Sequence, residues 1–378
     1  MLSDLLSVRA QSLRERGLWR ERTLVDGVPI SRHFASNDYL GLSADARVRK
    51  AFADAFARLS PCSAGSLVVS GYHPEHKALE AAFSEALNVE DCLVFGAGYT
   101  ANLALGRFLG RNGITLVMDK AIHASVYDGV SAAEGRFLRF RHVDADDMQA
   151  KVARAGENTA VMTESVFSMS GKTAPLALYA ERLRGTGVPL VVDEAHAFGV
   201  LGPEGLGGVA AAGVEAHVAL RVIPFGKAFA AQGAVVAGEA LYVQSLLQEA
   251  RSCIYSTAMS PALAQGLCDV LPIVRAADEL RARLDEIIHY FRACTRASPL
   301  SWADSTTAIQ QLRLGCPHRA LKLAGFLREK GFFCMAMREP TVTRVQTGLR
   351  VLLNSQHTPE AIDDFLKHIH VFHDTCDS

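Results

Sequence analysis

Short apolar runs alternate with segments of helical periodicity between about residues 75 and 240, and this alternation constrains the fold more than any other feature of the chain. Helix-length segments separate most of the runs, which is typical of an α/β domain with a mostly parallel sheet and helices on both faces. In such sheets ligands bind at the carboxyl ends of the strands. The predicted strands are residues 92–95, 114–118, 137–140, 159–163, 188–193, 218–223 and 233–237.

The pattern changes after Pro261. A long helical stretch, 262–297, is followed by predicted strands at 307–314, 332–337 and 348–353 and helices at 319–330 and 359–372, which indicate a small antiparallel sheet. A chain of 378 residues is too long for one small core. We therefore expect a continuous helix between two domains, with an N-terminal helix and segment over 1–45, a large domain over 46–265 and a small α+β domain over 266–378.

Composition excludes several classes of partner. The net charge of −1 gives no reason to expect nucleic acid or an anionic membrane, and no apolar run is long enough to span a bilayer. The N-terminus lacks the apolar core of a secretory signal, and residues 2–20 predict a packed amphipathic helix. The eight cysteines are scattered without a CxxC pair, which favours reduced thiols in a cytoplasmic protein over disulfides or a zinc site.

Lys227 follows a strand-end carboxylate in an order that can carry chemistry. The predicted strand 188–193 ends at Asp193, His196 comes three residues later, and Lys227 follows the next apolar run. Such a lysine can form a Schiff base with pyridoxal phosphate (PLP), and the aspartate can keep the pyridinium nitrogen protonated so that the ring accepts electrons. Taken alone, these residues are explained equally well by a strand-end aspartate, a surface lysine and a loop histidine.

A glycine turn follows the strand 92–95 and opens a helix, so its backbone N–H groups and the helix dipole make an anion site. From Gly96 to Ala101 the same turn matches the dinucleotide-binding pattern G-x-G-x-x-A, and Asp119 ends the next strand. An NAD-dependent dehydrogenase is therefore the alternative from another enzyme class. It leaves the lysine and the strand-end carboxylate without a function, and its motif lies nearly a hundred residues into the chain.

The remaining motifs favour neither a metal enzyme nor a hydrolase. The histidines near residue 75 lack a third ligand at useful spacing, and the C-terminal histidines fit a solvated helix. No G-x-S-x-G elbow and no Walker A loop is present. His123 follows the strand 114–118, where a histidine can stack on a flat ring or lie in a solvated loop.

Taken together, the motifs resemble the α-oxoamine synthase family, which implies a fold-type I PLP-transferase (aspartate-aminotransferase-like) large domain. The likeness extends from about Phe34 to the C-terminus. Several ordered motifs at family spacing are more specific than any one of them. They are FASNDYLGL at 34–42, Ala64-Gly65-Ser66, Val69-Ser70-Gly71, Gly98-Tyr99, Asp119, His123-Ala124-Ser125, ESVFSM at 164–169, Asp193-Glu194-Ala195-His196, Gly199 to Gly207, Phe225-Gly226-Lys227 and Tyr255-Ser256-Thr257.

The resemblance implies a role for each residue around the cofactor ring. Lys227 would carry PLP as a Schiff base and later move the substrate α-proton. Asp193 would pair with the pyridinium nitrogen, and His196 would hydrogen-bond the ring hydroxyl. His123 would stack on the ring, and Ser168 would lie beside it.

The resemblance also implies a phosphate site and a partner subunit. Gly98 and Tyr99 would offer backbone N–H groups to the phosphate. Tyr255, Ser256 and Thr257 would reach the phosphate of the neighbouring subunit, so that the active site is shared within a homodimer.

The substrates implied are an amino acid and an acyl thioester of coenzyme A or acyl carrier protein. Asn37 would bind substrate, and Arg338 or Arg350 would grip the amino-acid or keto-acid carboxylate as a bidentate fork. Within the family, the chain is most similar to members that act in biotin biosynthesis, where they condense L-alanine with a pimeloyl thioester and form 8-amino-7-oxononanoate. This similarity lies in residues 36–43, 303–310 and 340–342. A glycine or serine acyltransferase, or a synthase of an α-amino-ketone signal, is the alternative within the family.

Three positions depart from the family pattern. Pro224 stands where a threonine usually holds the phosphate, and it offers no donor. Leu67 replaces an arginine, and the loop 339–345 differs from the usual proline-rich form. A divergent biotin enzyme and an enzyme that makes another α-amino ketone both fit these changes, and a catalytically silent partner subunit is a third reading of Pro224.

Overall fold

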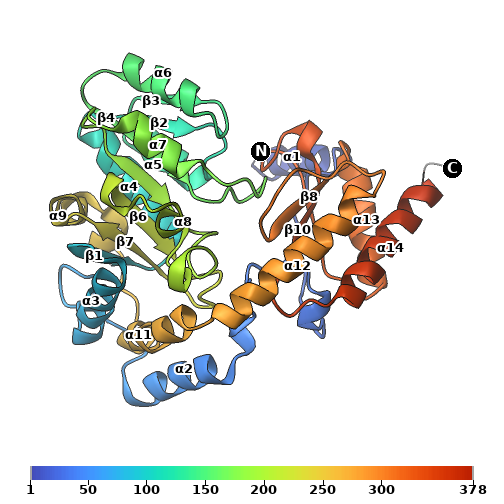
Figure 1. Cartoon of the computed structure of the whole chain (residues 1–378), viewed down its shortest axis with the longest axis horizontal. Coiled ribbons are helices and arrows are strands. Elements are labelled where there is room, and N and C mark those ends of the chain that lie inside the picture. Colours follow the sequence, from blue (N-terminus) through green and yellow to red (C-terminus); the bar gives the residue numbers. More distant parts are fainter. Residues whose placement is uncertain (1, 377–378) are drawn as a thin grey trace. The chain divides into compact units, whose positions relative to one another are not determined.

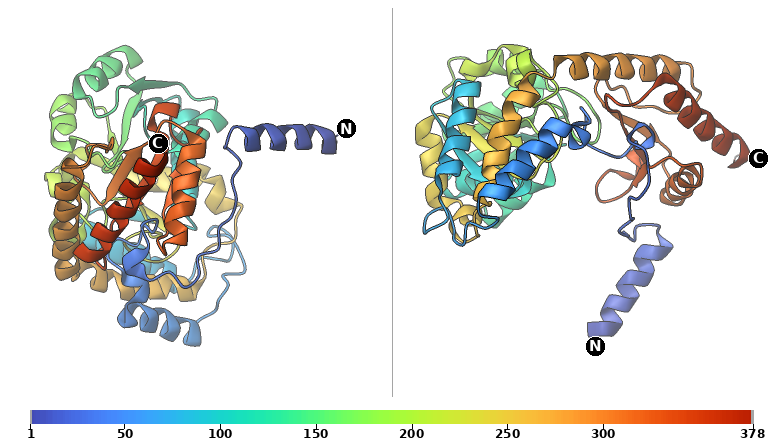
Figure 2. Two further views of the ribbon diagram at one scale, coloured as in Figure 1. Left: turned by 90° about the vertical axis from the view of Figure 1, so that its right-hand side faces the viewer. Right: turned by 90° about the horizontal axis from the view of Figure 1, so that it is seen from below.

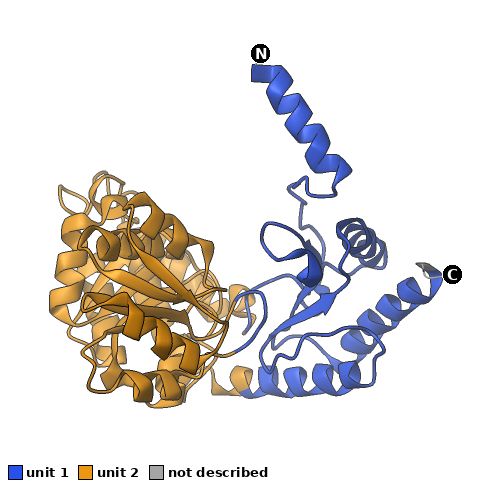
Figure 3. Cartoon of the chain, turned by 90° about the horizontal axis from the view of Figure 1, so that it is seen from above, with its two compact units in different colours: residues 1–39, 168–172, 282–378 blue, residues 40–167, 173–281 orange. Residues whose placement is uncertain are grey.

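The computed structural model describes residues 2–376 and divides the chain into two compact units. Unit 1 comprises Met1–Tyr39, Ser168–Lys172 and Ala282–Ser378, and unit 2 comprises Leu40–Phe167 and Thr173–Arg281 (Figure 3). The N-terminal segment thus shares a unit with the C-terminal third of the chain. The division near residue 281 falls within helix α12 (Asp278–Arg296).

Unit 2 is built on a seven-stranded sheet in the order β1-β7-β6-β5-β4-β2-β3 (Figure 1). Strands β2 to β6 pair in parallel with one another, whereas β7 is antiparallel to both β1 and β6. All seven predicted strands are present within two residues of their expected ends. They are β1 (Asp91–Phe95), β2 (Thr115–Asp119), β3 (Phe137–Phe140), β4 (Thr159–Glu164), β5 (Leu190–Asp193), β6 (Val218–Pro224) and β7 (Ala234–Gly238).

Helices cover both faces of this sheet because the central strands are apolar on both sides. One buried cluster joins Leu116, Met118 and Val191 to helices α4, α5, α9 and α10, and a second joins Val117 and Val192 to α6, α7 and α8. The helices of unit 2 are η2 (Leu42–Ala44), α2 (Ala46–Arg58), α3 (Pro74–Leu87), α4 (Gly98–Arg111), α5 (Ala124–Ala132), α6 (Ala145–Ala155), α7 (Leu176–Leu183), η3 (Pro203–Gly205), α8 (Gly208–Ala212), η4 (Glu215–His217), α9 (Ala240–Glu249), α10 (Arg251–Ile254) and α11 (Pro261–Arg275).

Unit 1 contains a three-stranded antiparallel sheet in the order β8-β10-β9, as the sequence predicts. Its central strand β10 carries Leu349 and Val351, which are fully buried. The elements of this sheet and the helices of the unit are α1 (Leu2–Glu15), η1 (Ile30–Arg32), most of α12, β8 (Ile309–Arg313), α13 (Pro317–Glu329), β9 (Met335–Met337), η5 (Arg344–Gln346), β10 (Gly348–Leu352) and α14 (Pro359–Cys376).

The prediction of one continuous helix over residues 262–297 is wrong, because the structure has two helices, α11 and α12, that meet at Ala276 and Ala277. The guanidinium of Arg281 donates to the carbonyls of Val274 (2.8 Å) and Arg275 (2.6 Å). This side chain therefore satisfies carbonyls that a continuing helix would have used.

The N-terminal helix is present but differs from the expectation of a packed helix ending near residue 20. Helix α1 ends at Glu15 because Gly17, with φ +65°, begins a turn in which Leu18 N donates to Leu13 O (2.7 Å). None of its described side chains is buried, and Figure 2 draws it as a separate rod at one end of its unit. No helix among residues 2–376 is both long and apolar enough to cross a membrane.

His357 makes the stability of unit 1 depend on pH. Its ring is fully buried, stacks on Phe34 at 4.2 Å and accepts a hydrogen bond from Asn354 N (3.0 Å). Burial, with a smaller contribution from His33, lowers the pKa of His357 to about 3. The unfolded chain takes up this proton near pH 6.5, so stability is complete above that pH and falls as the solution is acidified toward the folded pKa.

We expect acidification from pH 7.5 to pH 5 to cost about 2 kcal/mol of unfolding free energy through His357 alone. In His357→Gln the difference between the two pH values should shrink by that amount, although the variant is less stable at both. Denaturant titration at each pH measures this. His289→Gln, at an exposed histidine, is the control, and an undiminished pH difference in His357→Gln would contradict the assignment.

Candidate active site

Asp193 lies at the carboxyl end of β5, on the edge of the sheet where the alternation of strands and helices predicts ligand binding. Its carboxylate is 3% exposed and accepts hydrogen bonds from Ala195 N (2.8 Å) and Asn102 Nδ2 (2.7 Å). Asn102 belongs to helix α4, which opens at the glycine turn. Sequence reasoning gave this asparagine no role, although its place one turn into that helix was a usable signal.

The residue after Asp193 builds the loop that follows. Glu194 is fully buried and accepts hydrogen bonds from Ser165 Oγ (2.7 Å), Gly208 N (2.8 Å), Val209 N (2.9 Å) and Arg221 (3.2 Å). Arg221 lies in the middle of β6, so the two charges form a buried ion pair. Because the pair is further satisfied by backbone and hydroxyl donors, it fixes the loop against the end of β5.

Lys227 lies in the turn that joins β6 to the antiparallel strand β7. Ala230 N donates to Lys227 O (2.8 Å), and Ala231 N donates to Phe225 O (3.0 Å). Phe225 and Phe229, on either side of the lysine, are buried and pack against Phe83 with ring centroids 5.2 and 5.9 Å away. The aromatic cluster anchors the turn and leaves Lys227 half-buried.

His123 is the N-cap of helix α5, and its Nδ1 accepts from Ser125 N (3.3 Å). The side chain is exposed, yet the protein around it desolvates the ring and lowers its pKa below the ordinary value. Lys227 lowers this pKa further and Asp193 opposes the shift, so the three predicted residues form one electrostatic group.

Gly98 begins helix α4, whose N-cap, Ala97, has no side chain that can cap it. The first backbone N–H groups, those of Gly98 and Tyr99, therefore suit an anion. A Cβ on Gly98 would lie 2.5 Å from Cγ of Pro224, so the proline ring fills the space that another residue would need at the helix start. Tyr99 packs edge-on to His123 with centroids 6.4 Å apart, and its hydroxyl donates to Asp128.

The remaining predicted residues of unit 2 differ in exposure. His196 is 8% exposed and lies in the turn in which Ala197 N donates to Glu194 O (2.9 Å). Ser256 and Thr257 follow helix α10 and are exposed, next to Tyr255, which is 69% exposed. Their position on the surface leaves them accessible to another molecule.

Three predicted residues meet inside unit 1. Arg350, on β10, is 8% exposed; its Nε donates to Ser168 O (2.7 Å) and one terminal nitrogen donates to Asn37 Oδ1 (3.2 Å). Arg350 also forms a hydrogen bond with the hydroxyl of Tyr39. Burial raises the pKa of this hydroxyl above its usual value. Asn37, Ser168 and Arg350 are thus a connected polar group.

Arg338 lies apart from that group. Its guanidinium donates to the backbone carbonyls of Gly17 (2.8 Å) and Trp19 (3.3 Å), and burial lowers its pKa. These contacts anchor the segment that follows α1.

Comparison with known proteins decides the family. The model of the aminotransferase class I and II family matches residues 32–369. The 8-amino-7-oxononanoate synthase of Acidithiobacillus ferrooxidans (strain ATCC 53993 / BNL-5-31) is 38% identical over 368 residues, which cover 93% of this chain and 94% of that one. The chain belongs to the α-oxoamine synthase family. The predictions of the family and of a PLP-dependent acyltransferase are thereby confirmed.

Two solved structures have the same fold as this α-oxoamine synthase. Sphingomonas wittichii serine palmitoyltransferase superposes with a TM-score of 0.90 at 25% identity, covering 98% of this chain and 97% of that one. An 8-amino-7-oxononanoate synthase from Francisella tularensis gives 0.79 at 29% identity, covering 93% and 100%. The predicted fold-type I architecture is therefore confirmed.

The dehydrogenase alternative is wrong for this α-oxoamine synthase. Strand β1, which leads into the glycine turn, pairs antiparallel with β7, whereas a dinucleotide-binding unit needs parallel neighbours. Asp119, the acidic residue that completes the fingerprint, is fully buried and accepts hydrogen bonds from Ala121 N (2.8 Å) and Val143 N (2.8 Å). It fixes the loops after β2 and β3, so the fingerprint match is coincidental.

The residues of unit 2 fit PLP, as the sequence predicted. Asp193 is a buried carboxylate held by two neutral donors, and Asn102 Oδ1 beside it is buried without a hydrogen-bond partner. This donor set suits a cationic ring nitrogen. The uncapped start of α4 suits a phosphate, and Lys227 suits an aldehyde. Within residues 2–376, no group of three histidine, cysteine or acidic side chains could hold a metal ion.

Proposed function

We propose that this α-oxoamine synthase condenses L-alanine with a pimeloyl thioester, of coenzyme A or acyl carrier protein, in biotin biosynthesis. The products are 8-amino-7-oxononanoate, carbon dioxide and the free thiol. The observation that carries the proposal is the likeness to 8-amino-7-oxononanoate synthases at 35–40% identity over most of both chains. Serine or glycine as the amino acid is the alternative, supported by the fold of serine palmitoyltransferase.

The residues of unit 2 would hold the cofactor, which supplies an electron sink for the substrate carbanion. Lys227 binds its aldehyde, and Asp193 keeps a proton on its ring nitrogen. His196 is placed on the same turn as Asp193 and donates to the ring hydroxyl, and His123 covers the ring. The N–H groups of Gly98 and Tyr99 bind the phosphate, to which Pro224 adds no donor.

Once freed, the amine of Lys227 takes the α-proton of the amino acid and later returns one to the product. Arg350 binds the substrate carboxylate together with Asn37, because both lie in the polar group that contains Ser168. Arg338 is the weaker candidate, since backbone carbonyls of the N-terminal segment already occupy its guanidinium.

We further propose that the enzyme is a homodimer and lies in the cytoplasm. Tyr255, Ser256 and Thr257 are exposed in one chain, which supports a contribution to the phosphate site of a partner subunit. Seven cysteines are free thiols, which supports a reducing compartment; they are Cys62, Cys92, Cys253, Cys268, Cys294, Cys316 and Cys334.

Thiol release tests the proposed function directly. Purified protein loaded with PLP would be given pimeloyl-CoA or pimeloyl acyl carrier protein with L-alanine. We expect release with this pair and the mass of 8-amino-7-oxononanoate among the products. Matched reactions would replace alanine by glycine or L-serine, and the pimeloyl chain by palmitoyl or acetyl.

Release with a different pair would retain the family chemistry but move the enzyme to another pathway, with the loop 339–345 as the first region to examine. Release with no pair, from protein that has bound PLP, would contradict the proposal and favour the silent-subunit reading of Pro224.

A further inference from the structure

The loop Ser168–Lys172 belongs to unit 1 although the chain enters and leaves it through unit 2. An antiparallel bridge between Val166 and Thr173 closes its base, and Ala174 N donates to Ser165 O (2.9 Å). At the first residue of the loop, the carbonyl of Ser168 accepts the Nε hydrogen bond of Arg350. The orientation of Arg350 therefore depends on where this loop is held.

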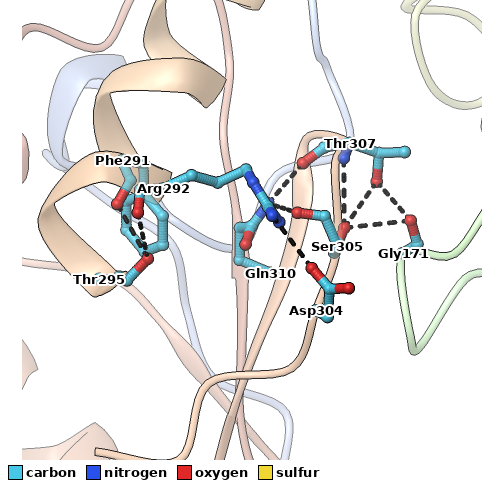
Figure 4. Close-up of polar contacts among 8 residues, drawn as sticks. All are labelled: Gly171, Phe291, Arg292, Thr295, Asp304, Ser305, Thr307 and Gln310. Atoms are coloured by element: carbon cyan, nitrogen blue, oxygen red, sulfur yellow. Dashed lines mark hydrogen bonds and ion pairs between the residues drawn. The ribbon is translucent and has the colours of Figure 1, made fainter. Parts of the chain in front are cut away.

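A second attachment holds the same loop three residues later. The hydroxyls of Ser305 and Thr307 both donate to the carbonyl of Gly171, at 3.0 Å each (Figure 4). Gly171 is buried, and Ser305 is 2% exposed. A carbonyl oxygen has two lone pairs, so this pair of hydroxyls satisfies it completely.

The two hydroxyl donors are themselves fixed. Ser305 Oγ accepts from Thr307 N (3.2 Å) and Thr307 Oγ1 accepts from Ile309 N (3.3 Å), and the two hydroxyl oxygens lie 3.2 Å apart, so backbone donors hold both oxygens beside the carbonyl of Gly171. The buried amide of Gln310 on β8 donates to Thr307 O (2.6 Å) and Ser305 O (3.4 Å) (Figure 4). The pair of donors is thus built rigidly onto the small sheet.

The loop approaches these residues so closely that only glycine fits at the contact. Gly171 has φ +65°, and a Cβ there would lie 2.2 Å from Ile309 O and 2.3 Å from Ser305 Oγ. Any other residue would be strained and would also push the loop off its donors.

We propose that Ser305, Thr307 and Gly171 are positioning residues for amino-acid binding, because they fix the loop whose Ser168 carbonyl orients Arg350. The inference rests on the proposed function, in which Arg350 binds the substrate carboxylate. A guanidinium recognises a carboxylate through two parallel hydrogen bonds, so the plane of the group must be fixed before the substrate arrives. The hydrogen bond from Nε to Ser168 O fixes the plane of the guanidinium. The hydrogen bonds of Ser305 and Thr307 to Gly171 O fix the position of Ser168.

The test removes both donors in Ser305→Ala/Thr307→Val. Alanine affinity, measured from the change in the absorption spectrum of the bound cofactor, should fall about tenfold, and KM for alanine should rise equally. The cofactor content and the KM for the thioester should stay unchanged. Thr306→Val is the matched control, because Thr306 lies between the two donors and is exposed.

Three further variants separate positioning from general stability. Thr307→Ser keeps the hydroxyl and should bind alanine as the wild type does. Ser305→Ala and Thr307→Val, made singly, each leave one donor and should give intermediate affinities, so a double variant that does not fold still leaves the inference testable. A loss of thermal stability with unchanged alanine affinity would overturn the inference.

Arg350→Lys separates this inference from the proposed function. If it weakens alanine binding while Ser305→Ala/Thr307→Val binds alanine normally, the positioning role is wrong and the role of Arg350 stands. If Arg350→Lys itself binds alanine normally, the carboxylate role of Arg350 is wrong and the inference is overturned with it.

Discussion

Replacing Lys227 by alanine should reduce thiol release at least about a thousandfold, because one substitution removes both the amine that binds the cofactor and the base that moves the substrate proton. The fold should persist, since the turn is anchored by the buried rings of Phe225 and Phe229 and not by the lysine side chain. The melting temperature should therefore stay within a few degrees of that of the wild type.

Borohydride reduction supplies a readout independent of turnover. In the wild type it should attach the cofactor covalently to Lys227, which the mass of the protein detects, and in Lys227→Ala it should attach none. Lys50→Ala, at an exposed ion pair with Asp54 on α2, is the matched control and should keep full activity and labelling. An active Lys227→Ala enzyme would remove Lys227 from the mechanism.

The sequence was sufficient to predict the strands of unit 2 because, apart from the partly exposed edge strand β3, each is a short, largely apolar run that the sheet buries. Their order was not predictable from it. Hydrophobic periodicity reports which side of a strand is buried but carries no information on its neighbours. The antiparallel direction of β7, and with it the tight turn that presents Lys227, therefore came only from the structure.

The candidate catalytic residues were easier to find in the sequence than the residues that hold them in place. Asp193 ends a strand and Lys227 follows one, so their positions in the pattern marked them. Asn102 lies one turn into the helix that follows the glycine turn, but its hydrogen bond to Asp193, which is distant in sequence, is visible only in the structure. Arg221 was a missed signal, because an arginine in the middle of an apolar strand requires a buried anion, and Glu194 supplies it.

The sequence left open which of two arginines is the better candidate for binding the substrate carboxylate, and their contacts in the structure differ. Both Arg338 and Arg350 lie on or next to strands of the small sheet, so local pattern treats them alike. Arg338 binds the backbone near Gly17, whereas Arg350 joins Asn37 and Ser168. Long-range partners of this kind depend on the tertiary fold.

Replacing Asp193 by asparagine should lower kcat about a thousandfold. An ion pair at close contact in a site of intermediate polarity is worth about 4 kcal/mol, and losing it from the transition state costs about three powers of ten in rate. Without the carboxylate, the ring nitrogen is no longer held protonated at neutral pH. The absorption spectrum of the bound cofactor should then change with pH in a range where that of the wild type is constant.

The variant should fold, because the surroundings of Asp193 accept an amide. The new side-chain oxygen can still accept from Ala195 N, and Asn102 can rotate its amide so that Oδ1, which lacks a partner, accepts from the new NH2 group. The substitution Asp193→Asn therefore removes a negative charge and keeps the local structure. Asp119→Asn is the matched control, since Asp119 is an equally buried carboxylate at the end of β2 with backbone donors of its own.

Asp119→Asn should lose stability, because Ala121 N and Val143 N donate to different carboxylate oxygens and the amide nitrogen that replaces one of these oxygens cannot accept. The spectrum of its bound cofactor should keep the pH dependence of the wild type. The two variants thus separate a carboxylate that fixes loops from one that controls the charge of the cofactor. If Asp193→Asn kept its rate and spectrum, Asp193 would have only a structural role like that of Asp119, and the pairing with the ring nitrogen would be wrong.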